Sequence, residues 1–308
     1  MSNFATLKKS SGNIDRLVKE IDNLNKPGSA KKEVDERFWK PEPDKTGNGM
    51  AVIRFLPAAE MDGDGPPWVR VFDHFFKGPT GKYYVENSLT TIKQEDPVSE
   101  YNKMLWNSTN DDNSPQRKQV REQKRGLTYY SNIYVITDAK NPANEGKVFL
   151  FKYGKKIFDK IQDCFHPPFD EHGRSSEDPK YDPTNAFNPF DLWKGANFKL
   201  RMRMVDGYRS YEASTFDTPG PLHPDDAILE KIWKQEHSIQ QFVHPSQFKP
   251  YEELKKKLDD VLGLGSTMAP SVSPGVRVTE KPVEKKSMAA ISDDEDDDLE
   301  QFKSLLND

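Results

Sequence analysis

The stretch between Trp39 and Phe216 consists of short apolar runs separated by turn-forming residues, and this pattern limits the possible folds more than any other feature. Each run has the length of one β-strand, and glycine-, proline- and asparagine-rich stretches such as 78–81 and 141–146 separate the runs. Strands are expected at residues 50–56, 68–76, 82–88, 129–137, 147–153 and 197–205. Several short strands with long insertions predict a mainly β fold with α additions, either a small barrel or a sandwich.

Residues 197–205 give the clearest strand signal, because apolar and cationic side chains alternate along them. The apolar face carries Phe198, Leu200, Met202 and Met204, and the opposite face carries Lys199, Arg201 and Arg203. We therefore expect a strand that buries one face and exposes a row of positive charge on the other.

Helical spacing of apolar residues predicts a helix over residues 155–164, a second helix opened by Pro224 and a third that ends at Gly263. Residues 106–125 and 166–191 are polar and show no apolar period. Both of these segments are expected to be loops.

Shifts in composition divide the chain into a body and two ends. Residues 1–26 join a basic-hydroxyl stretch to an amphipathic helix, residues 27–263 form the body, and residues 264–290 are a Ser-, Pro-, Thr- and Lys-rich linker. Residues 291–308 hold eight acids and one lysine, a charge of −7, so the other 290 residues carry +2 of the total −5. This asymmetry is typical of a nucleic-acid-binding protein with a regulatory tail, although acidic tails also occur as solubilising segments.

The sequence lacks the features of several other protein classes. Its one cysteine, Cys164, excludes an intrachain disulfide framework and a multi-cysteine zinc finger, and fits a reducing cytoplasm. No apolar run reaches the roughly 18 residues of a membrane-spanning helix, and residues 1–29 lack a signal-peptide core, so a soluble protein is expected. Phosphate-binding-loop, nucleophile-elbow and zinc-protease motifs are absent, so no enzyme is expected.

Aromatic residues interleave with lysine and arginine in three segments, residues 124–130, 147–156 and 201–211. Single strands of nucleic acid are held in this way, because bases stack on aromatic rings while cations contact the phosphates. The basic recognition helix of a duplex reader is not evident. The simpler alternative is that the aromatics are core residues and the cations a solvated sheet face, but three such segments favour single-strand binding.

Several motifs occur in a characteristic order along the chain. They are Gly47 to Pro57 (GNGMAVIRFLP), Asn144 to Phe149 (NEGKVF), Gly154 to Ile161 (GKKIFDKI), Trp193 to Phe198 (WKGANF) and the final Leu-Leu-Asn-Asp. With them the chain resembles the single-stranded DNA-binding proteins of T-even-like bacteriophages. The resemblance implies an OB-fold core, a five-stranded Greek-key barrel with helical elements. It also implies N-terminal self-association through residues 1–26 and a disordered acidic tail, residues 291–308, that binds replication proteins.

The cation–aromatic segments and the resemblance together indicate which residues bind DNA, mediate self-association and bind partner proteins. The aromatics expected to line a DNA cleft are Tyr129, Tyr130, Phe151, Tyr208 and Tyr211, with Trp106 replacing a further one. The cations expected to contact DNA are Lys124, Arg125, Lys147, Lys155, Lys156, Lys199, Arg201 and Arg203. Self-association is assigned to Lys8, Lys9, Ser10 and Ser11. Partner binding is assigned to Asp293, Asp294, Glu295, Asp296, Asp297, Asp298, Leu299, Phe302, Leu305 and Leu306.

The zinc site of the resembling family is expected to be lost. That family binds one zinc through a histidine and three cysteines, and the residues at these positions here are His74, Ser88, Asp96 and Ser99. Serine hydroxyls are poor zinc ligands, and one His with one Asp falls short of a four-ligand site. We therefore expect no metal and no cofactor. The subdomain at residues 74–110 would instead be held by packing of Tyr101, Leu105 and Trp106.

The expected function is cooperative, sequence-nonspecific coating of single-stranded DNA in phage DNA replication, recombination and repair, in the cytoplasm of the infected bacterial host. The expected partners are single-stranded DNA, further copies of the chain along the DNA, and phage replication and recombination proteins. The latter include a polymerase, a helicase loader, a primase and a recombination mediator, and no membrane is involved. An RNA-binding or replication-scaffold protein of the same fold is the alternative, since stacking and phosphate contacts suit both nucleic acids.

Overall fold

The computed structural model describes residues 35–264 except residues 179, 181 and 206. The chain divides into two units, residues 1–37 and residues 38–308, and the second unit is described below. The predicted self-association segment, the linker beyond residue 264 and the acidic tail lie outside the described residues. The described part is mainly β with helical additions, as predicted.

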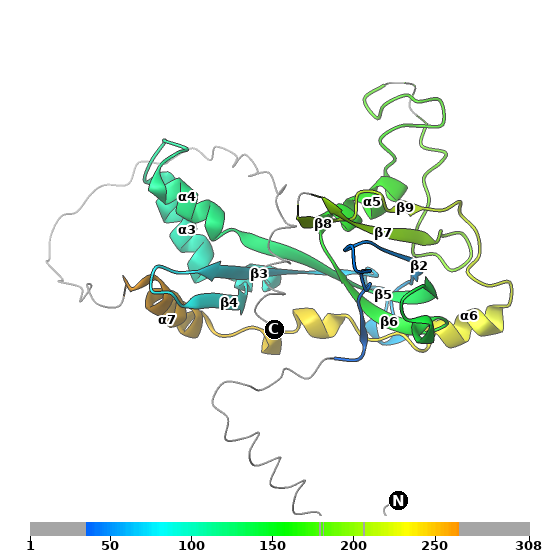
Figure 1. The fold of residues 1–308 in the computed structure, drawn as a ribbon, viewed down its shortest axis with the longest axis horizontal. Helices are drawn as coiled ribbons and strands as arrows, with labels where there is room; N and C mark the ends of the chain where they lie inside the picture. Colours follow the sequence, from blue (N-terminus) through cyan, green and yellow to red (C-terminus); the bar gives the residue numbers. More distant parts are fainter. Residues whose placement is uncertain (1–34, 179, 181, 206, 265–308) are drawn as a thin grey trace, which may run out of the picture. The chain divides into compact units, whose positions relative to one another are not determined.

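The strands of the described residues form one nine-stranded sheet (Figure 1). They are β1 (Phe38–Trp39), β2 (Gly49–Phe55), β3 (Val69–Lys77), β4 (Tyr83–Asn87), β5 (Arg125–Asp138), β6 (Val148–Tyr153), β7 (Phe198–Val205), β8 (Tyr208–Ser210) and β9 (Thr215–Phe216). The main path runs β1–β6–β5–β2–β7–β8, while β3 pairs with β4 and β5, and β9 pairs with β7. The six predicted strands are confirmed, and β5 is longer at both ends than predicted.

Helices and single turns connect the strands. The α-helices of the described residues are α3 (Pro97–Asn107), α4 (Pro115–Glu122), α5 (Lys155–Phe165), α6 (Asp226–Trp233) and α7 (Tyr251–Leu262). The 3₁₀ turns are η1 (Glu60–Asp62), η2 (Leu89–Ile92), η3 (Pro142–Asn144), η4 (Gln240–Val243) and η5 (Pro245–Gln247). The three helices predicted within residues 155–263 are confirmed as α5, α6 and α7.

The prediction of a loop over residues 106–125 is wrong, because α4 lies inside this segment and α3 ends in it. Asp96 caps α3 by accepting a hydrogen bond from the Ser99 N–H, and Ser114 caps α4 by accepting one from the Arg117 N–H. A proline follows each cap at the first helical position, where its missing N–H costs nothing. Residues 166–191 are a loop as predicted; their described part holds no helix or strand beyond one isolated bridge.

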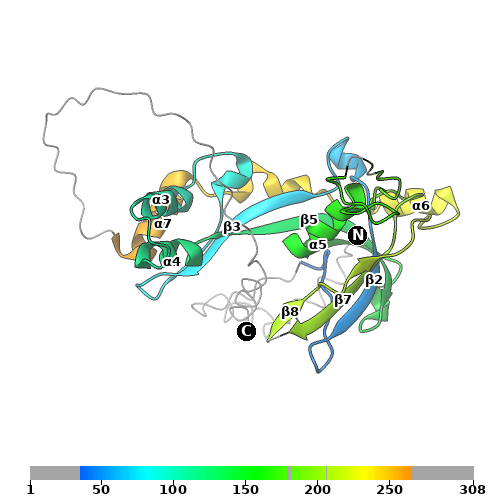
Figure 2. The same ribbon diagram turned by 90° about the horizontal axis from the view of Figure 1, so that it is seen from above.

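The central strands follow a Greek-key order. β2, β5 and β6 pair as antiparallel neighbours, and the chain then passes through α5 before β7 pairs with the other edge of β2. The spatial order β6–β5–β2–β7 is therefore that of a Greek key. The β3–β4 hairpin is inserted between β2 and β5 in sequence and pairs along the first part of β5 (Figure 2). β5 consequently belongs both to the Greek key and to the hairpin.

The main core lies inside the Greek key. Ile53 and Phe55 of β2 are fully buried, and the ring of Phe55 lies 5.6 Å from that of Phe190. Arg54, between them, is also buried and donates to the carbonyl oxygens of Asp191 at 3.0 Å and Gly220 at 2.6 Å. This arginine therefore ties two loops to β2, and burial lowers its pKa to about 10.

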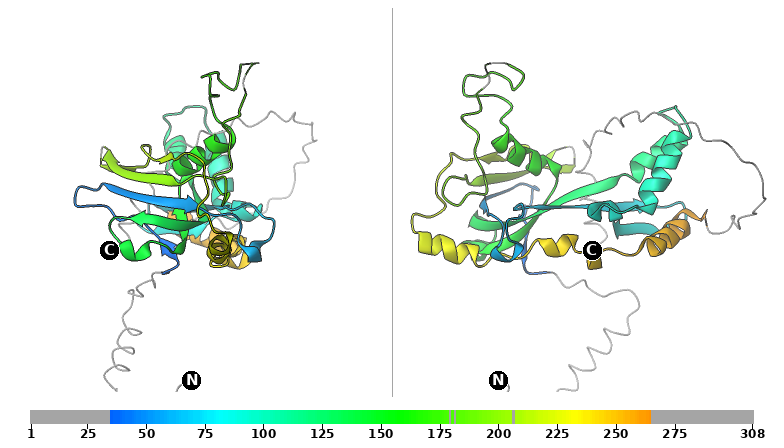
Figure 3. Two further views of the ribbon diagram at one scale, coloured as in Figure 1. Left: turned by 90° about the vertical axis from the view of Figure 1, so that its right-hand side faces the viewer. Right: turned by 180° about the vertical axis from the view of Figure 1, so that it is seen from behind.

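A second core joins the β3–β4 hairpin to α3 and α7 (Figure 3). Phe76 and Tyr84 stack with ring centroids 5.1 Å apart, and Leu254 and Leu258 of α7 pack in the same cluster. The Thr80 hydroxyl, in the hairpin turn, donates to a carbonyl oxygen near the end of α7 at 2.6 Å. The hairpin is thus completed by the last described helix of the chain.

Candidate nucleic-acid interface

The outward face of β7 and β8 carries cations beside apolar and aromatic side chains. The register pairs Arg201 with Met50 and Val205 with Tyr208, and Arg203 lies between the two pairs on β7. Residues directly opposite each other, and every second residue along a strand, share one face of a sheet. All five side chains are exposed, Met50 to 56% and Tyr208 to 45%. We call these five residues the β7–β8 surface.

The predicted alternation of β7 holds over most of the strand but fails at its end. Leu200 and Met202 are buried as predicted, whereas Met204 is 38% exposed. β2 begins with Gly49 opposite Met202, so no β2 residue covers Met204. Its side chain instead packs over Gly47, where an added Cβ would lie 2.2 Å from the Met204 Cγ and where φ is +82°. Glycine at position 47 is therefore required for both space and backbone conformation.

The cations of β7 differ in their electrostatic surroundings. Lys199 Nζ lies 2.8 Å from Asp217 Oδ2, and the hydrogen bond from Lys199 lowers the pKa of Asp217. Within the part of the chain that the structure describes, Arg201 and Arg203 have no carboxylate at ion-pair distance. Lys199 is thus already neutralised, and the two arginines are left to attract an anionic ligand.

The two predicted tyrosines after β7 lie in different surroundings. Tyr208 is exposed on the β7–β8 surface, where its ring is accessible to a base. Tyr211 is half-buried against the main core, and its hydroxyl lies 3.7 Å from the Met202 sulfur. The position of Tyr208 is compatible with base stacking, whereas Tyr211 makes core contacts.

Tyr129 and Phe151 are core residues in the structure, which does not fit their predicted role of stacking bases. Tyr129 is 6% exposed, and its ring stacks on Phe158 with centroids 3.9 Å apart. Phe151 is 3% exposed and packs edge-on against Trp39 at 5.4 Å. The simpler reading of these aromatics, as packing residues, is the one that the burial supports.

The other predicted aromatics are half-buried, and each has a ring face in contact with a neighbour. Tyr130 stacks on Phe242 with centroids 4.4 Å apart. The guanidinium carbon of Arg117 lies 3.8 Å from the centre of the Trp106 ring. One face of each ring is therefore occupied within the protein.

The remaining predicted cations lie on or next to β5, β6 and α5 rather than on β7 or β8. Lys147 is exposed, Lys124 and Lys156 are half-buried, Lys155 pairs with Asp159 at 3.0 Å, and Arg125 is exposed at the start of β5. The structure thus separates the predicted cations into groups on different strands. Arg125 lies beside residues of the neighbouring strand β3, which are described next.

Arg70 and Phe72, on β3, were missed by the sequence analysis. The guanidinium carbon of Arg125 lies 4.1 Å from the Phe72 ring centre, and that of Arg70 lies 5.6 Å from it. The available signal was the alternation of these two residues with the buried Val69 and Val71 within a predicted strand. Their proximity to Arg125 could not be seen, because it depends on the register of β3 against β5.

The four residues that the sequence resemblance places at zinc-ligand positions meet at one buried place beside the second core. His74 Nε2 lies 3.0 Å from Asp96 Oδ1, and the Ser88 hydroxyl donates to Asp96 Oδ2 at 3.0 Å. The Ser99 N–H donates to Asp96 Oδ1 at 2.9 Å. The other ring nitrogen of His74 lies 3.2 Å from the Gln123 carbonyl oxygen. The positions therefore form a hydrogen-bonded network centred on one carboxylate.

The electrostatics of this network favour an ionised Asp96. Burial is the largest single influence and opposes ionisation, but the hydrogen bonds from His74, Ser99 and Ser88 and the charge of His74 outweigh it, so that the pKa is well below its usual range. No three His, Cys, Asp or Glu residues among those described are grouped to hold a metal ion. Of the residues predicted to stabilise this subdomain, Tyr101 packs against the second core. The hydrogen-bonded network itself was not predicted.

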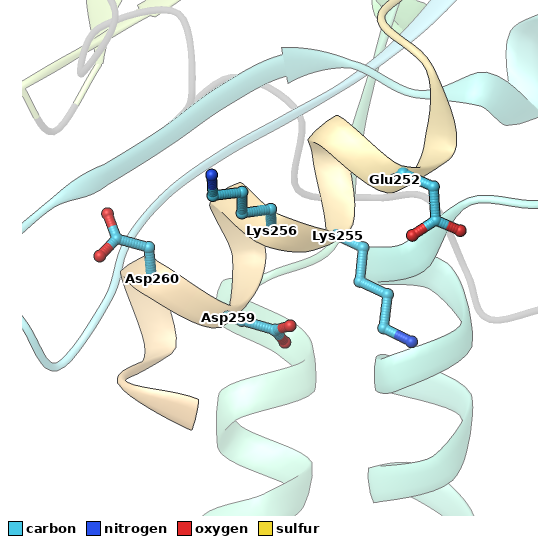
Figure 4. Close-up of a pocket in the computed structure, with 5 residues that line it drawn as sticks. All are labelled: Glu252, Lys255, Lys256, Asp259 and Asp260. Carbon is cyan, nitrogen blue, oxygen red and sulfur yellow. The ribbon is translucent and has the colours of Figure 1, made fainter. Parts of the chain in front are cut away.

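A pocket lies elsewhere, along α7 (Figure 4). Its lining residues are Glu252, Lys255, Lys256, Asp259 and Asp260. These side chains carry both signs of charge, and Figure 4 shows them fanning out from one helix rather than converging. Such a surface is typical of a solvated helix face.

No helix of the described residues is both long enough and apolar enough to cross a membrane.

Comparisons with known proteins agree with the chemistry of the β7–β8 surface. Residues 47–262 match the family model described as gp32 DNA binding protein like. The single-stranded DNA-binding protein of Enterobacteria phage T2 is 34% identical over 243 residues, which cover 78% of this chain and 74% of that protein. The single-stranded DNA-binding protein of Enterobacteria phage T4 is 34% identical over 233 residues, covering 74% and 71%. That of Escherichia phage SV14 is 39% identical over 79 residues, covering 25% and 66%.

Proposed function

The chain belongs to the family of gp32-like DNA-binding proteins, and from this membership we propose that it binds single-stranded DNA without sequence preference. In this role it coats and protects the strand during phage DNA replication, recombination and repair. The observation that carries the proposal is the β7–β8 surface, where two arginines with no carboxylate partner among the described residues lie beside an exposed tyrosine.

The chemistry of this surface suits a single strand. Arg201 and Arg203 protrude from the same face of one strand and can contact successive phosphates, which supplies affinity without reading sequence. Tyr208 offers a ring face on which any base can stack, with Met50 and Val205 as apolar neighbours. A duplex would keep its bases stacked within the helix, so the exposed ring favours a single strand.

A salt titration tests the proposal. The double variant Arg201→Gln/Arg203→Gln is compared with wild type in binding fluorescent oligo-dT over a range of salt concentrations. Each lost phosphate contact should reduce the slope of log K against log salt by about 0.7, so the double variant should lose about 1.4. The control is Lys231→Gln/Lys255→Gln, which removes the same charge from the exposed faces of α6 and α7.

Two outcomes of this titration would contradict parts of the proposal. An unchanged slope in the arginine variant would remove the β7–β8 surface from the interface. Failure of the wild-type protein to bind oligo-dT would contradict the proposed function itself. Repeating the titration with oligo-U distinguishes DNA from RNA as the preferred strand.

We assign the Greek key to the OB-fold class. The order β6–β5–β2–β7 and the parallel pairing of β1 with β6 support a partly open five-stranded barrel. Family membership supports a protein without catalytic activity.

The ends of the chain are assigned by their sequence alone. We propose that residues 1–26 mediate self-association along DNA and that residues 291–308 recruit replication and recombination proteins, joined to the body by residues 264–290. The network around Asp96 supports a body, residues 27–263, that folds without zinc. Action on phage DNA would place the protein in the cytoplasm of the infected host.

A further inference from the structure

Two arginines share one aromatic ring where β3 pairs with β5. Phe72 lies opposite Leu127 and Arg70 lies opposite Tyr129, so the side chains of Arg70 and Phe72 extend from the same face of β3. Arg125, on β5, lies opposite His74 and therefore reaches the same face. Its guanidinium carbon lies 4.1 Å from the Phe72 ring centre, and that of Arg70 lies 5.6 Å from it.

Among the described residues, no carboxylate compensates the positive charge of this arrangement. Arg70 and Arg125 are exposed, and among the described residues neither has a carboxylate at ion-pair distance. Arg125 donates to the Thr90 hydroxyl at 3.0 Å, a neutral acceptor that fixes the guanidinium without reducing its charge. Two like charges held at one ring repel each other, and an anion placed between them would remove that repulsion.

The donor geometry selects the type of anion. A guanidinium is planar, and its paired N–H groups match the oxygens of a phosphate. Cation–ring contact with Phe72 orients both guanidinium planes and lowers the side-chain entropy lost when they bind. We propose that Arg70, Phe72 and Arg125 form a phosphate-binding subsite on β3 and β5 that holds the backbone of the bound single strand; this inference rests on the proposed function. Arg70 and Arg125 make the contacts, and Phe72 positions them.

The test measures binding of fluorescent oligo-dT to the full chain carrying Arg70→Gln, Arg125→Gln, both changes or Phe72→Leu. Each arginine variant should lower affinity about tenfold, the size of one charged hydrogen-bond contact. Each should also reduce the salt slope by about 0.7. Phe72→Leu keeps both charges, so it should lower affinity while leaving the slope nearly unchanged. The control, Lys231→Gln, removes one exposed charge from α6, and equal thermal melting curves establish that the variants are folded.

The outcomes separate this inference from the proposed function. Should Arg70→Gln match Lys231→Gln in affinity and slope while Tyr208→Ala weakens binding, the subsite is wrong and the β7–β8 surface stands. Absence of oligo-dT binding by wild type would remove both. A gain of affinity in Arg70→Gln at low salt would mean that the arginines hold the acidic segment 291–308 of this chain instead of DNA, which also overturns the inference.

Discussion

Nε2 of His74, on β3, lies 3.0 Å from Oδ1 of Asp96, the residue that caps α3. This contact joins a strand to a helix at the positions that the sequence resemblance assigns to zinc ligands. Replacing Asp96 with Asn removes the charge and weakens every hydrogen bond to the carboxylate. Breaking a buried pair of this kind costs about 3 kcal/mol or more, so the free energy of unfolding in urea should fall by that amount. Asp260→Asn, which breaks the exposed Lys82–Asp260 pair, is the control and should cost about 0–1 kcal/mol.

The same carboxylate should make stability depend on acid pH. Because the folded pKa of Asp96 is below its unfolded value of 3.8, its contribution is fully present above pH 4 and is lost as pH falls toward the folded pKa. The stability difference between wild type and Asp96→Asn should therefore shrink on acidification below about pH 4. Urea titrations of both proteins between pH 2.5 and 6 measure this difference. A difference that stays constant over this range would mean that Asp96 is not ionised in the fold.

Chelation should leave the fold intact. The His74–Asp96 network occupies the zinc positions with hydrogen bonds, and serine hydroxyls offer no good zinc ligand. Protein purified with EDTA should contain well under one equivalent of zinc by elemental analysis, and its Tm should be unchanged by added zinc. Stoichiometric zinc that raises Tm would contradict this prediction.

Two aromatic substitutions should separate binding from packing. Tyr208→Ala removes an exposed ring, so affinity for oligo-dT should fall by about 1–3 kcal/mol with little change in Tm. Phe151→Ala removes a ring from the core and should cost about 3–5 kcal/mol of unfolding free energy, with affinity of the folded protein preserved. Fluorescence titration of oligo-dT binding and thermal melting, carried out on both variants, separate a role in binding from a role in packing. If Phe151→Ala weakened binding without loss of stability, the original assignment of this residue to the DNA cleft would be right.

Glu236 should make the protein less stable as pH rises. It is 3% exposed, and neither carboxylate oxygen has a hydrogen-bond partner within the described residues. Burial, with a smaller effect of Asp62, raises its pKa to about 9, so the folded state keeps the proton while the unfolded state loses it above about pH 4.5. Stability is therefore lost between those values, by about 1.4 kcal/mol per pH unit. Glu236→Gln cannot ionise, so its advantage over wild type in urea unfolding should grow by about 2–3 kcal/mol from pH 5 to pH 7. If the unfolding free energies of wild type and Glu236→Gln changed with pH in parallel, this effect of Glu236 would be ruled out.

Strand positions could be predicted from the sequence because each strand carries its own apolar pattern and turn residues. The loop prediction over residues 106–125 failed because α4 is polar and is specified by the cap Ser114 and the following Pro115 rather than by an apolar stripe. The exposure of Met204 could not be predicted either, since it depends on where the neighbouring strand β2 begins.

The candidate site was predicted in part. Arg201, Arg203 and Tyr208 are exposed together because alternation along β7 continues across the turn into β8. Tyr129 and Phe151 are buried although the sequence predicts that they stack bases, because an aromatic next to a lysine fits both a core and a stacking surface and the sequence does not show burial. The contact of Arg70 with Phe72 and its proximity to Arg125 depend on the register of β3 against β5. The contact of His74 depends on Asp96, which lies 22 positions away in the sequence. Local sequence patterns contain neither kind of information.

The closure of the β3–β4 hairpin by α7 has a consequence for synthesis on the ribosome. Phe76 and Tyr84 leave the exit tunnel long before Leu254 and Leu258, so the side of the second core that α7 covers stays open while the intervening chain is made. Translation at roughly 5–20 residues per second leaves that apolar surface open for several seconds or more. The nascent hairpin is thus exposed to chaperones and to other nascent chains until α7 has emerged and packed onto it.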